Sequence, residues 1–210
     1  RPTLLYVMKE AVNYEIEDII IVDGRGKSAI EDFFDTSYEL EDTLEKAGKI
    51  EALNSLQKIR SMANVISVRQ KYAGGLGHAV LTAKSVVGNE PFAVLLGDEI
   101  TLPKNNSTPV TQVLIQIYFD TEMFFVNVID VSREDTQKYG IIRFRSEEKT
   151  HGLPTFVVDS VIEKPQPEQA PSTLALPGRY IFAPEIFKHL QSIRPGKNGE
   201  LQLTDAMTRL

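Results

Sequence analysis

The chain has 210 residues, of which 42% are hydrophobic and 25% charged, so it can bury a core as a single domain over residues 1–210. It contains no cysteine, which excludes disulfides, thiolate metal sites and cysteine nucleophiles and fits a reducing, cytoplasmic location. The formal net charge of -6 and the lack of any apolar run of about 18 residues argue against a nucleic-acid binder and a membrane protein.

The first third of the chain alternates helices with strands. An apolar stripe over residues 4–12 predicts an amphipathic helix, and the run at 19–22 predicts a strand buried on both faces. A glycine turn at 23–27 leads into the next helix, and two amphipathic helices occupy 38–60. The turn carries a lysine, but its spacing matches neither G-x-G-x-x-G nor G-x-x-x-x-G-K-[ST], so we interpret it as an ordinary βα turn.

A second strand–glycine turn–helix unit follows at residues 65–87. Gln70 ends the strand, and an amide side chain offers both a donor and an acceptor, which suits the edge of a nucleobase. Gly75 and Gly77 lie in the turn, where missing side chains would let a flat ring approach the backbone. His78 has no second histidine at metal-ligand spacing, so we expect it to pack or hydrogen-bond locally.

The strand predicted at 92–96 ends in Gly97 and Asp98. Ligand sites in open α/β sheets lie at the carboxyl ends of strands. Gly97 would leave room for a substrate, and the Asp98 carboxylate is a hard oxygen ligand for a divalent cation that bridges phosphates. Taken alone, the same residues also fit a strand that ends in a polar turn.

The second half of the chain is predicted to be rich in strands. A polar loop at 101–109 precedes a helix around 113–117, a strand follows at 124–129, and a hairpin spans 139–162 with an exposed tip around 146–154. The returning strand ends in the charged pair Glu163 and Lys164. A strand at 178–182, a helix at 184–190 and a final helix from 200 onward complete the chain.

Five segments, in this order and spacing, resemble the bacterial UTP-glucose-1-phosphate uridylyltransferases, which are sugar nucleotidyltransferases. They are GLGHAV at 75–80, FAVLLGD at 92–98, KYGII at 138–142, VIEKP at 161–165 and ELQLTDA at 200–206. The resemblance implies a three-layer α/β/α nucleotide-binding sandwich, Rossmann-like, with a mixed and mostly parallel sheet. It also implies synthesis of UDP-glucose and pyrophosphate from UTP and glucose 1-phosphate, with Mg²⁺ as cofactor.

The resemblance assigns roles on the nucleotide side of the site. Gln70 matches the residue that reads uracil, and Gly75 and Gly77 match the turn beneath the base and ribose. Asp98 matches the magnesium ligand.

It also assigns the sugar side. Gly140, Glu163 and Gly178 match positions that line the sugar, with Glu163 accepting hydrogen bonds from glucose hydroxyls. Lys164 matches the cation on the sugar phosphate. The family's reaction needs no protein nucleophile, so Asp98 and Lys164 are the predicted catalytic groups.

The chain departs from the family pattern at both ends. The family opens with a glycine-rich triphosphate loop and closes beyond the final helix with a second metal-binding aspartate, and neither is found in these 210 residues. We therefore expect a polypeptide of these residues alone to be inactive. Two alternatives stay open, a glycosyltransferase of similar fold and a non-catalytic nucleotide-sugar binding module. A homodimer or homotetramer is compatible with the sequence, which leaves the oligomeric state undecided.

Overall fold

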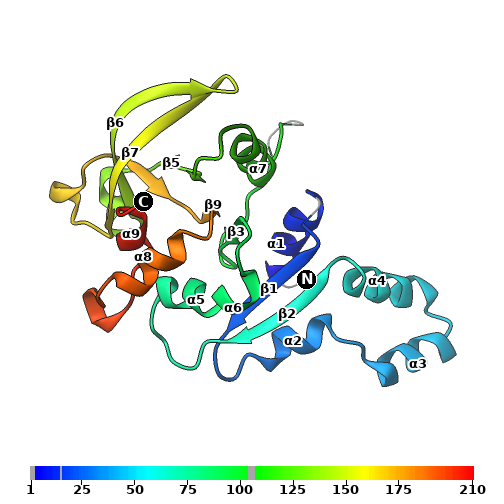
Figure 1. The fold of residues 1–210 in the computed structure, drawn as a ribbon. Coiled ribbons are helices and arrows are strands. Elements are labelled where there is room, and N and C mark those ends of the chain that lie inside the picture. Colours follow the sequence, from blue (N-terminus) through cyan, green and yellow to red (C-terminus); the bar gives the residue numbers. More distant parts are fainter. Residues whose placement is uncertain (1–2, 15, 104–106) are drawn as a thin grey trace.

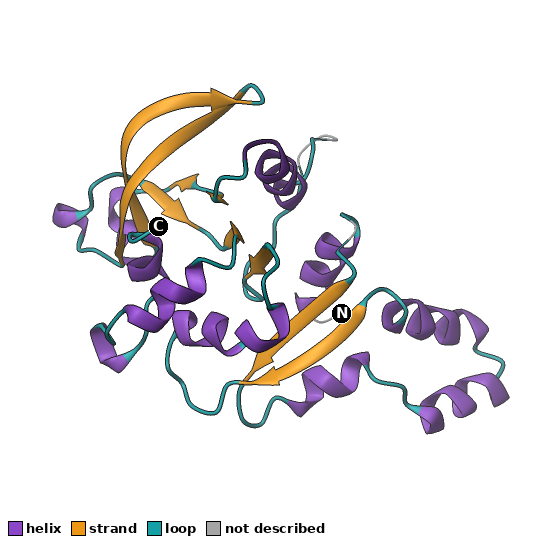
Figure 2. Ribbon diagram, in the orientation of Figure 1, coloured by secondary structure: helices purple, strands orange, loops and turns teal. Residues whose placement is uncertain are grey.

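The computed structural model describes residues 3–14, 16–103 and 107–210, so positions 104–106 of the predicted loop lie outside the described residues. It contains α-helices, short 3₁₀ helices and strands in alternation (Figures 1 and 2). The α-helices are α1 Thr3–Val12, α2 Ser28–Phe34, α3 Tyr38–Lys46, α4 Ile50–Arg60, α5 Leu76–Thr82, α6 Lys84–Val87, α7 Val110–Thr121, α8 Ile186–Ser192 and α9 Leu203–Met207. The strands are β1 Asp18–Asp23, β2 Asn64–Arg69, β3 Phe92–Leu95, β4 Phe125–Val126, β5 Ile129–Asp130, β6 Gly140–Thr150, β7 Leu153–Glu163, β8 Leu174–Leu176 and β9 Arg179–Phe182. The 3₁₀ helices are η1 Arg133–Lys138, η2 Pro167–Gln169 and η3 Lys197–Gly199.

The α/β class predicted from the sequence is confirmed, while the strand directions differ from the mostly parallel expectation. Among the described residues β1 and β2 pair in parallel, and the orders β3-β9-β4 and β5-β8-β6-β7 are antiparallel. An apolar run such as that of β3 shows that a strand is buried but carries no information about the direction of its neighbour. The antiparallel partner of β3 is β9, which lies more than eighty residues later in the chain.

The strand predicted at 124–129 is divided into β4 and β5. Asn127 lies between them and pairs with Arg179 twice, its backbone N–H donating to the Arg179 carbonyl at 3.1 Å and its side-chain oxygen accepting the Arg179 backbone N–H at 2.9 Å. The chain therefore leaves β9 at Asn127 and joins β8 two residues later. The sequence predicted one strand because five of its six residues are apolar.

Strands β6 and β7 form a long ribbon that projects from the molecule (Figure 1). The ladder continues to the pair Thr150↔Leu153, so most of the predicted tip at 146–154 is strand and the turn is confined to His151 and Gly152. Both turn residues have positive φ, 53° and 78°. His151 Nε2 lies 3.0 Å from the Asp120 carboxylate of α7 and thereby anchors the tip.

The main core lies where β9, α8 and α9 meet. Its buried side chains include Phe182, Phe187, Leu190 and Leu203, and the Phe92 ring of β3 stacks on that of Phe187 at 5.0 Å. The strands and helices that carry the predicted sugar and metal residues thus share one core. A smaller hydrophobic cluster joins α1, β1 and α2. No described helix has the length and apolarity to cross a membrane.

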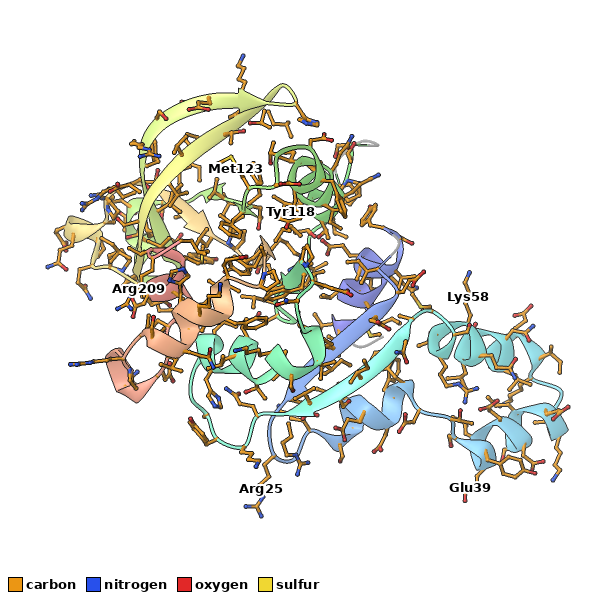
Figure 3. The ribbon with its side chains drawn as sticks, viewed as in Figure 1. Arg25, Glu39, Lys58, Tyr118, Met123 and Arg209 are labelled. Atoms are coloured by element: carbon orange, nitrogen blue, oxygen red, sulfur yellow. The ribbon has the colours of Figure 1, made fainter. Side chains whose placement is uncertain are left out.

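Helices α3 and α4 extend away from this core (Figure 1). Neither has a fully buried residue, and Glu39 of α3 and Lys58 of α4 point into solvent (Figure 3). Glu41 forms an ion pair with Arg60 between the two helices. Of the acidic face predicted for this region, Glu39 and Glu45 are exposed, whereas Glu41 is half-buried in its ion pair with Arg60.

Candidate active site

The turn that carries Gly97 and Asp98 follows β3 directly, and both residues are exposed. An added Cβ at Gly97 would meet only Leu4 Cδ1, at 3.8 Å, so the backbone here is open. Gly178 adjoins the turn because its carbonyl accepts the Leu96 N–H at 3.0 Å. Gly178 has φ 134°, and an added Cβ would lie 2.8 Å from Leu96 Cγ, so only glycine allows this approach. The structure thus brings Gly178 beside the Asp98 turn.

A buried ion pair lies under the same turn. Arg179 of β9 is 1% exposed at its side chain and pairs with Glu10 of α1, which is 8% exposed. The guanidinium makes two parallel contacts, Nε to Oε1 at 3.0 Å and Nη2 to Oε2 at 2.9 Å. Burial alone would raise the pKa of Glu10, but hydrogen bonds from Arg179 and Thr111 outweigh it and hold that pKa below its ordinary value of 4.5. The pair is therefore charged at neutral pH.

The predicted sugar residues Gly140, Glu163 and Lys164 lie together at the ends of β6 and β7. Gly140 and Glu163 face each other in the strand register, and Lys164 Nζ lies 3.8 Å from Glu163 Oε1. Thr204, at the start of α9, donates from Oγ1 to Glu163 Oε2 at 3.1 Å. An added Cβ at Gly140 would lie 2.9 Å from Thr204 Cγ2 and 3.5 Å from Glu163 Oε2, so glycine is needed for the three elements to meet.

Lys164 has a left-handed backbone, with φ 44°. Residues with a side chain adopt this conformation at a cost, and such residues concentrate at functional sites. The Lys164 N–H donates to the Tyr139 carbonyl at 3.0 Å, which fixes the turn at the end of β7. The side chain remains 55% exposed and leaves the strand beside Glu163.

Tyr180 of β9 is influenced electrostatically by both the predicted sugar residue Glu163 and the predicted metal ligand Asp98. Burial raises the pKa of its phenol above the ordinary value of 10.0. The negative charges of Glu163, Asp98 and Glu99 raise this pKa further, and the positive charge of Arg179 opposes the increase. The carboxylates of both groups are thus near enough to act on one ring. The phenol stays protonated across the physiological range and can donate a hydrogen bond.

The predicted nucleotide residues surround the start of α5. Gln70 Nε2 lies 3.1 Å from the Gly75 carbonyl and 2.9 Å from His78 Nδ1, and the Tyr72 and His78 rings are 4.3 Å apart. The expectation that His78 packs and bonds locally is confirmed. Gln70 directly follows β2, and its backbone N–H donates to the Asp23 carbonyl of β1 at 2.7 Å, which fixes the position of its backbone.

Gly75 and Gly77 meet another part of the chain closely. An added Cβ at Gly75 would lie 2.8 Å from Glu200 Cβ, and one at Gly77 would lie 2.7 Å from the Leu201 carbonyl oxygen. The Gly77 N–H donates to that oxygen at 2.9 Å. The glycines of this turn are therefore needed for packing against residues 200–201, and that segment continues to Thr204 on the sugar side.

Magnesium in proteins commonly keeps several waters and is held by one or two carboxylates together with substrate phosphates. The exposed Asp98 carboxylate at the end of β3 fits such a site, whereas a cage made by protein alone would need several ligands. Among the described residues no group of three His, Asp or Glu side chains is close enough to form one. The donor set thus suits a cation that arrives with phosphate.

Sequence reasoning missed Thr204, Tyr180, Arg179 and Glu10. Thr204 lies within the ELQLTDA segment, but its contact with Glu163 joins positions 41 residues apart. Arg179 carried a signal, because a charged residue within a short apolar strand is rarely buried unless it is paired. Its partner Glu10 is 169 positions away on an ordinary amphipathic helix, and no local pattern distinguishes it.

Comparison with known proteins gives one consistent result. A family model described as nucleotidyl transferase matches residues 1–210. The UTP–glucose-1-phosphate uridylyltransferase of Bacillus subtilis is 46% identical over 211 aligned residues, and that of Staphylococcus epidermidis is 44% identical over 210. In both cases the match covers 100% of this chain and 70% of the relative.

Solved structures agree with these sequences. A UDP-glucose pyrophosphorylase complexed with UDP-glucose superposes with a TM-score of 0.87 at 38% identity, covering 100% of this chain and 74% of that one. A UTP-bound UGPase from Acinetobacter baumannii gives a TM-score of 0.86 at 36% identity, covering 100% and 71%. By sequence and by fold, this chain belongs to the nucleotidyl transferase family and, within it, to the UTP–glucose-1-phosphate uridylyltransferases.

Proposed function

We propose that this protein makes UDP-glucose and pyrophosphate from UTP and glucose 1-phosphate. The observation that carries the proposal is the 44–46% identity to curated UTP–glucose-1-phosphate uridylyltransferases over the whole chain. The glycosyltransferase alternative is disfavoured, because the charged pair that ends β7 has no role in it. The metal-site strand also ends in Asp98-Glu99 instead of the Asp-x-Asp expected there.

In this reaction the phosphate of glucose 1-phosphate attacks the α-phosphorus of UTP in line and displaces pyrophosphate. The protein contributes position and charge, because two anions must approach each other and negative charge develops on the leaving group. We assign Asp98 as the side chain that would hold Mg²⁺, and the cation would neutralise phosphate charge there. Asp98 suits this role because it is exposed and follows a strand that is fixed by β9.

On the sugar side, Glu163 would accept hydrogen bonds from sugar hydroxyls, and Lys164 would pair with the sugar phosphate. Thr204 supports this assignment, since its hydrogen bond to Glu163 Oε2 fixes the orientation of the carboxylate. Gly140 and Gly178 supply backbone without side chains next to Glu163 and to the Asp98 turn, respectively.

On the nucleotide side, Gln70 would read uracil by accepting the N3–H of the base at Oε1. Its Nε2 is directed at the Gly75 carbonyl and His78, which supports this orientation of the amide. Gly75 and Gly77 would act mainly by letting residues 200–201 pack against the turn. This packing would in turn hold the turn in the shape that supports the base.

Calorimetry combined with turnover tests the proposal. The intact protein, supplied with UTP, glucose 1-phosphate and Mg²⁺, should form UDP-glucose with many turnovers and should bind UDP-glucose in the absence of pyrophosphate. Binding of UDP-glucose without any turnover would contradict the proposal and favour a non-catalytic nucleotide-sugar binding module.

A further inference from the structure

The buried ion pair of Glu10 and Arg179 is not used in the reaction, and its surroundings indicate a different role. Arg179 is the largest of the fully buried side chains among the described residues, although arginine is seldom found inside a protein. A buried ion pair contributes little to stability compared with apolar packing of the same volume, because both charges lose their hydration. Its presence therefore calls for an explanation other than stability.

Every N–H of the Arg179 guanidinium has an acceptor. Arginine offers five such donors in a fixed planar fork. Nε and one Nη2 hydrogen go to Glu10, at 3.0 and 2.9 Å. Nη1 reaches the carbonyls of Leu96 and Gly178 at 3.4 and 3.2 Å, and Nη2 also donates to the Glu99 carbonyl at 2.8 Å.

The contacted carbonyls lie on both sides of Asp98. Leu96 and Glu99 bracket the Gly97–Asp98 turn, and the guanidinium therefore holds the backbone before the turn and after it. The Glu99 N–H also donates to the Leu96 carbonyl, at 3.4 Å, which is a long hydrogen bond that fixes the turn weakly by itself. The 2.8 Å hydrogen bond from Arg179 Nη2 to the Glu99 carbonyl supplies the main further restraint, and the Nη1 contact with the Leu96 carbonyl, at 3.4 Å, adds a second, longer one.

Glu10 in turn fixes the guanidinium. Its carboxylate is held by the bidentate contact and accepts a further hydrogen bond from Thr111 Oγ1 of α7, a residue that is 1% exposed. A bidentate contact sets the plane of the guanidinium as well as its position. Helix α1, strand β9 and helix α7 are thereby connected beneath one turn.

We propose that Glu10 and Arg179 are positioning residues for the metal site, which orient the Asp98 carboxylate by clamping the carbonyls on both sides of it. The inference rests on the proposed function only in taking Asp98 as the Mg²⁺ ligand. Groups that orient a metal ligand typically account for about 10- to 100-fold in metal affinity. The clamp should therefore act mainly on metal affinity, although Nη1 also contacts the Gly178 carbonyl.

The test uses Arg179→Lys, because lysine keeps the charge that faces Glu10 but cannot reach the Leu96 and Glu99 carbonyls together. Glu10→Gln is the second variant, since it keeps the shape of the partner and removes its charge. Glu41→Gln is the matched control: Glu41 also pairs with an arginine, Arg60, but on the distant helices α3 and α4 (Figure 1). Asp98→Asn is the reference for loss of the metal ligand.

Mn²⁺ binding to the protein, measured from the EPR signal of the free ion against a protein-free sample that contains the same amount of UTP, is the readout, and thermal unfolding is followed in parallel. We expect Arg179→Lys and Glu10→Gln to weaken Mn²⁺ binding about tenfold. The affinity for glucose 1-phosphate should change much less than the affinity for Mn²⁺. Glu41→Gln should leave Mn²⁺ binding unchanged.

The outcomes separate the two levels of the argument. If Asp98→Asn weakens Mn²⁺ binding while the folded clamp variants bind it normally, the clamp is structural and the inference is overturned, although the metal role of Asp98 stands. If Asp98→Asn binds Mn²⁺ as tightly as the unaltered protein, the metal assignment itself is wrong and the inference fails with it. If one clamp variant does not fold, Mn²⁺ binding by the other variant decides the question. If neither variant folds, the ion pair is needed for stability and the inference is overturned.

Discussion

Replacing Gly77, the second residue of α5, by alanine tests how the glycine-rich start of this helix works. The added Cβ would lie 2.7 Å from the Leu201 carbonyl oxygen and 3.0 Å from Leu190 Cδ2. The oxygen belongs to a backbone that is itself held, because Leu201 accepts the Gly77 N–H at 2.9 Å and donates to the Gly74 carbonyl at 2.8 Å. Relief of the contact must therefore displace residues 200–201 and stretch both hydrogen bonds.

The magnitude follows from these contacts. Overpacking costs about 1–3 kcal/mol, and weakening two backbone hydrogen bonds adds about 1–3 kcal/mol. Alanine recovers about 1 kcal/mol, because it favours the helix more than glycine does. A net loss of about 3 kcal/mol in the free energy of unfolding corresponds to a decrease of roughly 10 °C in the melting temperature for a chain of this size.

Thermal unfolding followed by circular dichroism measures this effect, and Gly24→Ala is the matched control. An added Cβ at Gly24 would meet nothing within 4 Å, so its melting temperature should change by no more than about 2 °C. If Gly77→Ala melts normally but loses affinity for UTP, the turn is shaped by the nucleotide and not by Leu201, and the packing argument is refuted.

Three further predictions concern charged and polar side chains. Asp98→Asn should lower the turnover number by orders of magnitude in steady-state assays while the melting temperature stays nearly constant, and Glu99→Gln should have a much smaller effect; equal losses would make Asp98 structural. Lys164→Ala should raise the KM for glucose 1-phosphate far more than the KM for UTP. Gln70→Ala should instead raise the KM for UTP and weaken the selectivity for uracil. If Gln70→Ala still discriminates among nucleoside triphosphates as the unaltered protein does, Gln70 is not part of the site. Because the pKa of Glu10 is lowered in the folded protein, its charge stabilises the fold above pH 4.5 and that stabilisation is lost as the pH falls through the lowered pKa. Denaturant titrations from pH 7 to about pH 3 should thus show a smaller loss of stability for Glu10→Gln than for the unaltered protein, and identical pH profiles would show that Glu10 gains no stability from its charge.

The fold could be predicted from the sequence where local patterns are strong. The apolar runs of β1, β2 and β3 and the periodic helices α1, α2 and α7 were located within a few residues, because burial on a face or a stripe leaves a readable period. Strand direction could not be read in this way. The pairing of β3 with β9 depends on the path of the chain over more than eighty residues, and no period within either strand records it.

The same distinction holds for the candidate site. Side chains at strand ends, such as Asp98 and Lys164, could be proposed as candidates because a polar residue after an apolar run is visible in the sequence. The long-range contacts of the candidate site could not be predicted from the sequence. Thr204 reaches Glu163 across 41 positions and Glu10 reaches Arg179 across 169, so these pairs exist only after the core has formed. They are tertiary interactions, so they cannot be predicted from the sequence of any single segment.

The most direct test of the account is phosphorus NMR of the intact protein with UTP, glucose 1-phosphate and Mg²⁺. We expect the triphosphate resonances of UTP to give way to those of pyrophosphate and of the diphosphate of UDP-glucose in equal amounts, and we expect Asp98→Asn to slow this conversion by orders of magnitude. Release of inorganic phosphate with UDP, or unchanged UTP in the presence of tightly bound UDP-glucose, would contradict it.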